Sequence, residues 1–195
     1  MNWYLDIVKA YPIYSAMVQF AILGSLGDFI AKWIQGRKAG QSFPYQGKLL
    51  ALYIAWKPLE WVILAVLIKA AFIGFTGFVD ALVDKALIPK CFSTSGCPLN
   101  AAAISISMNA QFGLLLVIVH RALDCLPFGK IQWDGIVKGF YSLVWFWIPA
   151  HTITFMLPKD FQIGLAAVWS LALGLILGLF NTSGIQKKVV TEEKI

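Results

Sequence analysis

The sequence predicts an all-α integral membrane protein: a helical bundle with four membrane spans and a fifth, short helix that is kinked or interfacial. Three observations predict this class. Apolar residues make up 59% of the 195 residues, and charged residues only 13%. Soluble globular proteins have about 45–50% apolar and about 25% charged residues. The mean hydropathy is +0.73, and the apolar residues gather in continuous runs rather than in the alternating segments of a β-barrel.

Five apolar segments make up the predicted single membrane domain, residues 1–195. A membrane span needs about 20 apolar residues to cross a hydrocarbon core of about 30 Å, and each segment meets that length. The segments are 13–34, 49–79, 99–119, 136–157 and 161–180.

Two of these segments are not expected to be simple spans. As one helix, 49–79 would be about 46 Å long at about 1.5 Å per residue. It must therefore tilt, kink at Pro58, or leave the membrane near Gly74 and Gly77. Segment 136–157 is interrupted by Pro149 and carries an aromatic cluster typical of the membrane interface, so it is the predicted fifth helix. Orientation stays open, because the balance of basic residues between the two sides depends on whether this segment spans.

The composition also excludes several function classes: disordered proteins, coiled coils, nucleic-acid-binding modules and ordinary soluble enzymes. The formal net charge is +6, but most basic residues lie in the links between apolar runs. There they flank spans and meet anionic lipid headgroups. Membrane lipids are therefore expected partners, and nucleic acid is not.

Charged residues inside the spans are the first candidates for a functional site. Asp28 and Lys32 are four residues apart and share a helix face. They could contact a solute or gate a pore, or they could close the first span onto a neighbour. We expect Asp28 to pair with Lys32 or with a cation from another helix. Lys57 and Glu60 lie inside the second segment, where ionisable groups are functional candidates by default, unless that helix enters the membrane only after Trp61.

The last span carries a small residue at every fourth position. These residues are Ala166, Ser170, Gly174 and Gly178. Such a stripe lets another helix approach closely, and the third span offers a partner face with the same spacing in Ala103, Ser107 and Gln111. We expect these faces to pack together. A pore lining of small polar residues is the alternative, in which the lumen would use Asp28, Lys32, Lys57, Glu60, Ser107 and Gln111.

Cysteine and histidine patterns offer little chemistry. Cys91 and Cys97 could form a disulfide on an oxidising side of the membrane, or remain free thiols. No metal site is expected, since a fourth ligand and a Cys-x-x-Cys spacing are missing. His120 and Asp124 have one residue too few between them for an acyltransferase box, and His151 has no acidic neighbour in sequence. We therefore expect no enzymatic reaction and no cofactor.

Two blocks of residues resemble a known family. The first block consists of Tyr4, Pro12, Gly24, Gly27 and Asp28. The second consists of Trp147-Ile148-Pro149-Ala150, Phe155 and Leu157-Pro158, followed by Trp169 in the final span. In their kind and spacing these residues resemble the Mpv-seventeen family, which includes the 22-kilodalton peroxisomal membrane protein. The resemblance implies a four-span, non-enzymatic protein of the inner mitochondrial or peroxisomal membrane. Some family members are thought to form pores for small solutes.

The chain departs from this family at several polar positions. Lys32 replaces a Gln, Ala110 an Asp, and Thr154 an Asn. If the family's polar residues at these positions line a pore, this chain has partly lost the pore lining. The polar tail 186–195 should also fray unless a neighbouring chain holds it. The leading hypothesis is therefore an accessory subunit of a larger mitochondrial inner-membrane complex of respiratory-chain type, with its polar groups paired off. The alternative is a small-solute channel of the mitochondrial inner or peroxisomal membrane, with a polar lumen. Residues 1–12 do not resemble a secretory signal or a presequence, so internal targeting is expected.

Overall fold

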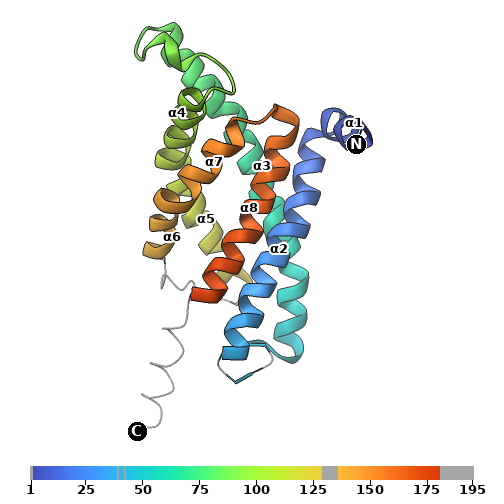
Figure 1. The fold of residues 1–195 in the computed structure, drawn as a ribbon. Helices are drawn as coiled ribbons and strands as arrows, with labels where there is room; N and C mark the ends of the chain where they lie inside the picture. Colours follow the sequence, from blue (N-terminus) through green and yellow to red (C-terminus); the bar gives the residue numbers. More distant parts are fainter. Residues whose placement is uncertain (1, 39, 42, 129–135, 181–195) are drawn as a thin grey trace.

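The computed structural model describes residues 2–38, 40–41, 43–128 and 136–180, and within these ranges every regular element is a helix (Figure 1). Four helical stretches are long and apolar enough to cross a membrane, which confirms the predicted helical bundle with four spans. The polar tail 186–195 lies outside the described residues. The spans are α2 (Pro12–Lys38), α3 (Gly47–Asp84), the run α4 (Pro98–Met108), η2 (Asn109–Gly113) and α5 (Leu114–Cys125), and α8 (Lys159–Phe180).

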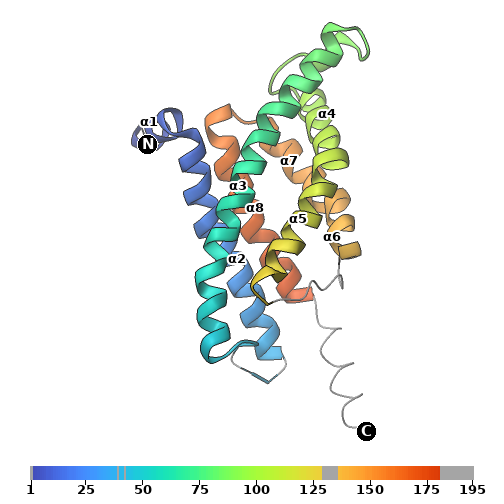
Figure 2. The ribbon, with the colours of Figure 1, turned by 180° about the vertical axis from the view of Figure 1, so that it is seen from behind.

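The fifth element is a helical run that packs against the spans. It consists of α6 (Ile136–Ser142), the π-helical turn η4 (Leu143–Trp147) and α7 (Ile148–Phe155). Pro149 lies in the first turn of α7, where its missing N–H costs least, and the irregular turn directly precedes it. The run packs along α4 and α5 (Figures 1 and 2). It is therefore kinked, as expected, and it packs one face against the bundle, while side chains on its other face, such as Tyr141 and Val144, are exposed.

Helix α3 is the longest element, at about 57 Å for its 38 residues. It passes through Pro58 as one helix, and its C-terminal end extends beyond the ends of α2 and α8 (Figures 1 and 2). Gly74 and Gly77 lie in the extending part, where a Cβ added to either would meet nothing within 4 Å. The sequence left three alternatives for this segment: a tilt, a kink at Pro58, or an exit near Gly74 and Gly77. The structure favours the last, because the helix runs past the bundle near these glycines.

Two short elements lie at this end of the bundle. The 3-10 turn η1 (Lys90–Phe92) leads from α3 to α4, and α1 (Asn2–Ala10) precedes α2. The ring of Tyr4 on α1 stacks on Phe161 at the start of α8, with 6.3 Å between ring centroids. Lys9 lies 3.5 Å from Asp160. These contacts hold α1 against the bundle, with Trp3 exposed as at a membrane interface.

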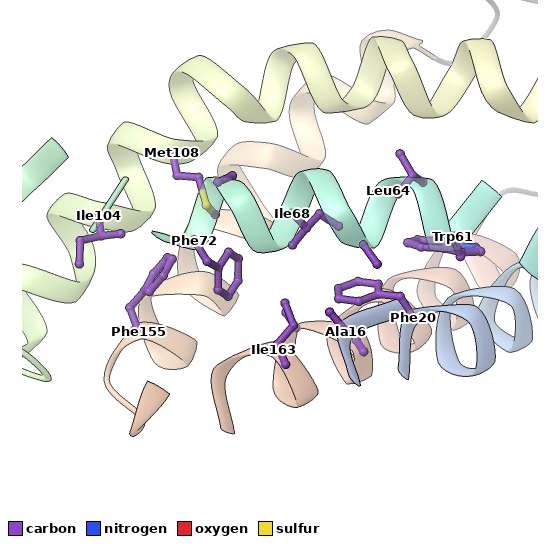
Figure 3. Close-up of a cluster of buried hydrophobic side chains, with 14 of the residues drawn as sticks. Ala16, Phe20, Trp61, Leu64, Ile68, Phe72, Ile104, Met108, Phe155 and Ile163 are labelled. Atoms are coloured by element: carbon purple, nitrogen blue, oxygen red, sulfur yellow. The ribbon is translucent and has the colours of Figure 1, made fainter. Parts of the chain in front are cut away.

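The core runs along one face of α3 (Figure 3). Phe20 of α2 stacks on Trp61 at 5.9 Å between ring centroids, and Phe72 packs on Phe155 of α7 at 4.8 Å. Ile163 of α8 is fully buried beside them. In this way α3 joins the α2–α8 pair to the α4–α7 pair.

The small residues of α8 pack against α2. A Cβ added to Gly174 would lie 2.7 Å from the carbonyl of Gly27, and one added to Gly178 would lie 2.8 Å from the Cα of Ala31. In the opposite direction, a Cβ added to Gly27 would lie 3.2 Å from the backbone carbonyl oxygen of Ser170. The stripe is therefore a close helix–helix contact, as its spacing predicted.

The partner predicted for that stripe is wrong. Helix α4 packs on α3 and α7, whereas α8 packs most extensively on α2. Of the predicted partner face, Ser107 is half-buried and Gln111 is exposed. The physical reason is that Gly27 and Ala31 also present small residues four apart, so α2 allows the closer backbone approach.

Candidate functional site

A cavity of ≈ 500 Å³ lies inside the bundle, within the range of about 300–1,000 Å³ typical of small-molecule sites. It is partly open, and its walls come from α2, α3, α5, α8 and the fifth helical run. Lys57 and Phe72 both line it, so it extends about 22 Å along α3 at about 1.5 Å per residue. The bundle therefore encloses an elongated space and not only a packed core.

The two ends of the cavity differ in chemistry. One end is charged, with side chains of α2, α3 and α5, whereas Asn109 and His151 supply neutral polar groups near the other end. Apolar side chains such as Ile68 and Leu116 line the space between. Ile104 and Phe155 fill the interior beyond Phe72, and Ile163 fills it level with Ile68 (Figure 3); each is at most 3% exposed. We refer to these three residues as the apolar plug.

Lys57 is the centre of the charged end. It is only 2% exposed, and its Nζ lies 3.1 Å from Asp28 Oδ2 on α2 and 3.0 Å from Glu60 Oε2 on its own helix. It also donates a hydrogen bond to Asp124 Oδ1 on α5. A buried ammonium needs such compensation, because leaving one charge unpaired in a low dielectric is costly. One lysine thus joins carboxylates from three helices.

The surrounding side chains complete this network. Glu60 is fully buried, with Oε1 3.2 Å from His120 Nε2. The indole of Trp61 donates to Asp28 Oδ2 at 3.0 Å, and Arg121 Nη1 lies 3.4 Å from Asp124 Oδ2. We refer to the group formed by Asp28, Lys57, Glu60, His120, Arg121 and Asp124 as the ion network.

The structure brings three of the predicted site residues together and separates the others. Asp28, Lys57 and Glu60 meet in the ion network, so Asp28 pairs with a cation from another helix, one of the two expected arrangements. Lys32 is half-buried and also lines the cavity. Its ammonium lies over the ring of Tyr45, 5.9 Å from the centroid, and is not among the ion-pair partners of Asp28 described here.

Ser107 and Gln111 are not part of this site. Gln111 is exposed and donates to the backbone carbonyl of Ser107 at 3.3 Å. Neither residue lines the cavity. Their spacing placed them correctly on one helix face, but that face points away from the cavity.

Sequence reasoning missed the contribution of α5. His120, Arg121 and Asp124 were considered only as a weak enzyme box, yet all three line the cavity. A spacing of four residues between His120 and Asp124 does place them on one helix face. Asp124 pairs with Lys57, which is 67 residues away in sequence, and no local pattern reveals such a contact.

The neutral polar end was also missed. Asn109 Nδ2 lies 3.1 Å from His151 Nδ1 and donates to the carbonyl of Ser105 at 2.8 Å. The ring of His151 stacks on Trp147, with 4.9 Å between centroids. Asn109 and Trp147 belong to the π-helical turns η2 and η4, which contact each other. Such turns are frequent at functional sites.

The cysteines and the carboxylates show no metal or disulfide chemistry in the described part of the chain. Cys91 and Cys97 are separate thiols, so the disulfide considered from the sequence is not formed and the alternative of two thiols describes the structure. No group of three His, Cys, Asp or Glu side chains among the described residues could hold a metal ion. The carboxylates of the ion network converge on Lys57 instead.

The fold and the site define a class: a helical membrane protein with four spans and a partly open internal cavity that is charged at one end. Comparisons of the chain with protein-family models, curated proteins and solved structures found no match. The resemblance to the Mpv-seventeen family therefore stays a prediction.

Proposed function

We propose that this protein is a non-enzymatic membrane protein that passes a small solute through its helical bundle. The observation that supports this most is the cavity, which is partly open and large enough for a small molecule. Of the two functions expected from the sequence, the small-solute channel accounts for this space, whereas an accessory subunit has no need of it.

The arrangement also suggests how passage would be controlled. The apolar plug fills the interior around Phe72 (Figure 3), so a solute that entered at the charged end would stop there. Passage therefore requires the helices that carry the plug, α4, α7 and α8, to move relative to one another. The ion network joins α2, α3 and α5, and would keep the charged end in place during that movement.

Solute flux through proteoliposomes tests this proposal. Purified protein is reconstituted, and swelling is followed for urea, glycerol, lactate and sucrose. Leu116→Trp should reduce flux at least severalfold, because Leu116 lines the cavity and the larger ring would fill it. Leu115→Trp is the matched control, since Leu115 is the adjacent residue and is 56% exposed. Equal flux through both variants and the parent, with both variants folded, would overturn the proposal.

The accessory-subunit function remains a second candidate because of one observation. Lys57 forms ion pairs with both Asp28 and Glu60, as expected if these groups serve structure. Native electrophoresis of gently solubilised membranes tests this candidate: migration inside a large complex would support it, and migration as a monomer or small homo-oligomer would contradict it. A location in the mitochondrial inner or peroxisomal membrane is proposed from the family resemblance alone. Fractionation of cells that express the tagged chain would test it.

A further inference from the structure

We propose that the neutral polar end of the cavity binds a neutral amide, a molecule whose carbonyl oxygen and N–H group lie side by side. This inference names the class of solute and rests on the proposed function. It depends on two polar atoms, Asn109 Oδ1 and His151 Nε2, which face the cavity and have no hydrogen-bond partner among the described residues.

The hydrogen bonds of Asn109 fix which of its side-chain atoms is the nitrogen. That atom lies 2.8 Å from the backbone carbonyl oxygen of Ser105, and only an N–H group can donate to this oxygen. The same nitrogen lies 3.1 Å from His151 Nδ1. One of its two hydrogens therefore points toward Ser105 and the other toward His151, and Oδ1 is left as an unused acceptor.

The same contact fixes the tautomer of His151. Since Asn109 donates, Nδ1 must accept, and the ring hydrogen of the neutral imidazole lies on Nε2. This Nε2–H group makes no hydrogen bond to a described residue. His151 is only 7% exposed, so its donor is largely shielded from bulk water, and leaving such a donor unpaired is costly.

Both unused atoms are open to the cavity. Asn109 and His151 line it, and neither Oδ1 nor Nε2 is among the described side-chain atoms that are fully buried without a partner. Gly113 also lines the cavity, four residues after Asn109. A Cβ added to Gly113 would lie 3.4 Å from Oδ1, so the glycine leaves the approach to this acceptor open.

A neutral amide matches this pair of atoms. Oδ1 and Nε2 each lie two covalent bonds from one end of the Asn109–His151 hydrogen bond, so a ligand that joins them needs an acceptor and a donor close together. The carbonyl oxygen of an amide accepts from the Nε2–H group, and its N–H group donates to Oδ1. A carboxylate offers no donor and an ammonium no acceptor, so either would leave one protein group unpaired.

The surroundings favour a flat apolar body on the amide. The ring of His151 stacks on Trp147, with 4.9 Å between centroids, and packs edge-to-face on Phe72 at 5.5 Å. Trp147 and Phe72 line the cavity, as do Ile68 and Leu116. An apolar body gains free energy by leaving water along these walls, and an aromatic ring can stack there. Benzamide combines such a ring with the amide group.

NMR of the histidine rings tests the site directly. The chain contains two histidines, His120 and His151, so isotope-labelled histidine gives two sets of ring signals, which His151→Gln assigns. In nanodiscs of the full chain we expect His151 in the Nε2–H tautomer, and benzamide should shift its Nε2–H signal saturably. Acetophenone, in which a methyl group replaces the NH₂ group, should bind at least about fivefold more weakly, because it leaves Asn109 Oδ1 unpaired.

Three results would overturn the proposal. The first is an Nδ1–H tautomer of His151. The second is a benzamide titration without a saturable shift, which would show that the two atoms bind water only. The third is equal affinity for benzamide and for either acetophenone or benzyl alcohol, since the amide group would then not be what is recognised.

Asparagine variants test the acceptor. Asn109→Leu should remove the advantage of benzamide over acetophenone. Asn100→Leu is the matched control: Asn100 is equally buried, at 3% exposure, but donates to the carbonyl of Phe92 and does not line the cavity. It should leave benzamide binding unchanged, and equal affinity in both variants would contradict the role of Asn109. If Asn109→Leu does not fold, the comparison of benzamide with acetophenone on the parent chain decides the same point.

Solute swelling measured on the same preparations separates this inference from the proposed function. Flux of urea and glycerol without saturable binding of benzamide overturns only the amide class. Saturable binding of benzamide without flux of any solute supports the site and overturns the passage of solute.

Discussion

The ammonium of Lys57 on α3 lies 3.1 Å from the carboxylate of Asp28 on α2, and this contact joins two spans that are consecutive in sequence. Lys57 is almost fully buried, and Asp28 also accepts a hydrogen bond from Trp61. Two side chains of α3 therefore fix the position of the Asp28 carboxylate. Asp28 and Lys57 both line the cavity. The first two predictions concern this pair.

Removing the cation should be severely destabilising. Lys57→Met keeps most of the volume but leaves the carboxylates of Asp28, Glu60 and Asp124 without their shared partner. Breaking a buried pair by removing one member costs about 3–5 kcal/mol. We expect a much lower melting temperature in detergent. The control is Lys48→Met on the same helix, where the lysine is exposed. Similar melting of both variants would contradict a central role for Lys57.

Changes at Asp28 should separate its charge from its hydrogen bond. Asp28→Asn keeps an oxygen that can accept from Trp61 Nε1, now 3.0 Å away, whereas Asp28→Leu leaves both the indole and Lys57 with one partner fewer. An unsatisfied buried donor costs about 1–3 kcal/mol. We therefore expect Asp28→Asn to be the milder change in thermal melting. If the two variants melt together, the carboxylate is not acting as a paired group.

A larger side chain at Gly174 should separate α8 from α2. An added Cβ would already lie 2.7 Å from the carbonyl carbon and oxygen of Gly27, so Gly174→Leu requires two backbones to move apart. We expect a lower yield of folded protein and a lower melting temperature. Gly77→Leu makes the same substitution where a Cβ meets nothing within 4 Å, and should be tolerated. Normal behaviour of Gly174→Leu would refute this packing.

The two cysteines near the start of α4 should react as thiols without reduction. Cys91 is exposed and Cys97 is half-buried, so a maleimide should label both, Cys91 faster. Mass spectrometry after labelling counts the modified residues, and a Cys91→Ser variant assigns the fast site. Labelling of this pair only after treatment with a reductant would show that they form a disulfide.

Much of the fold could be predicted because membrane spans are encoded locally. About 20 consecutive apolar residues are enough to define a helix that crosses a bilayer, where every backbone group must find its partner within the segment. The four spans follow from this rule, and the fifth segment, 136–157, was set apart by Pro149 and its aromatic cluster. Ser170, Gly174 and Gly178 are four residues apart, so they lie on one face of a single helix. A close helix–helix contact on that face could therefore also be predicted.

The class of protein, the spans and the residue types inside them could be read from the amino-acid sequence, since these depend on neighbours along the chain. Which helix faces meet depends on the three-dimensional arrangement of the helices. This arrangement placed Gly174 against Gly27 of α2 rather than against α4, and it joined Lys57 to Asp124, 67 residues away. It also turned Gln111 outward and left a cavity beside the core. Helix faces with similar spacing can pair in several ways, and the choice among them depends on the fit of all the helices at once.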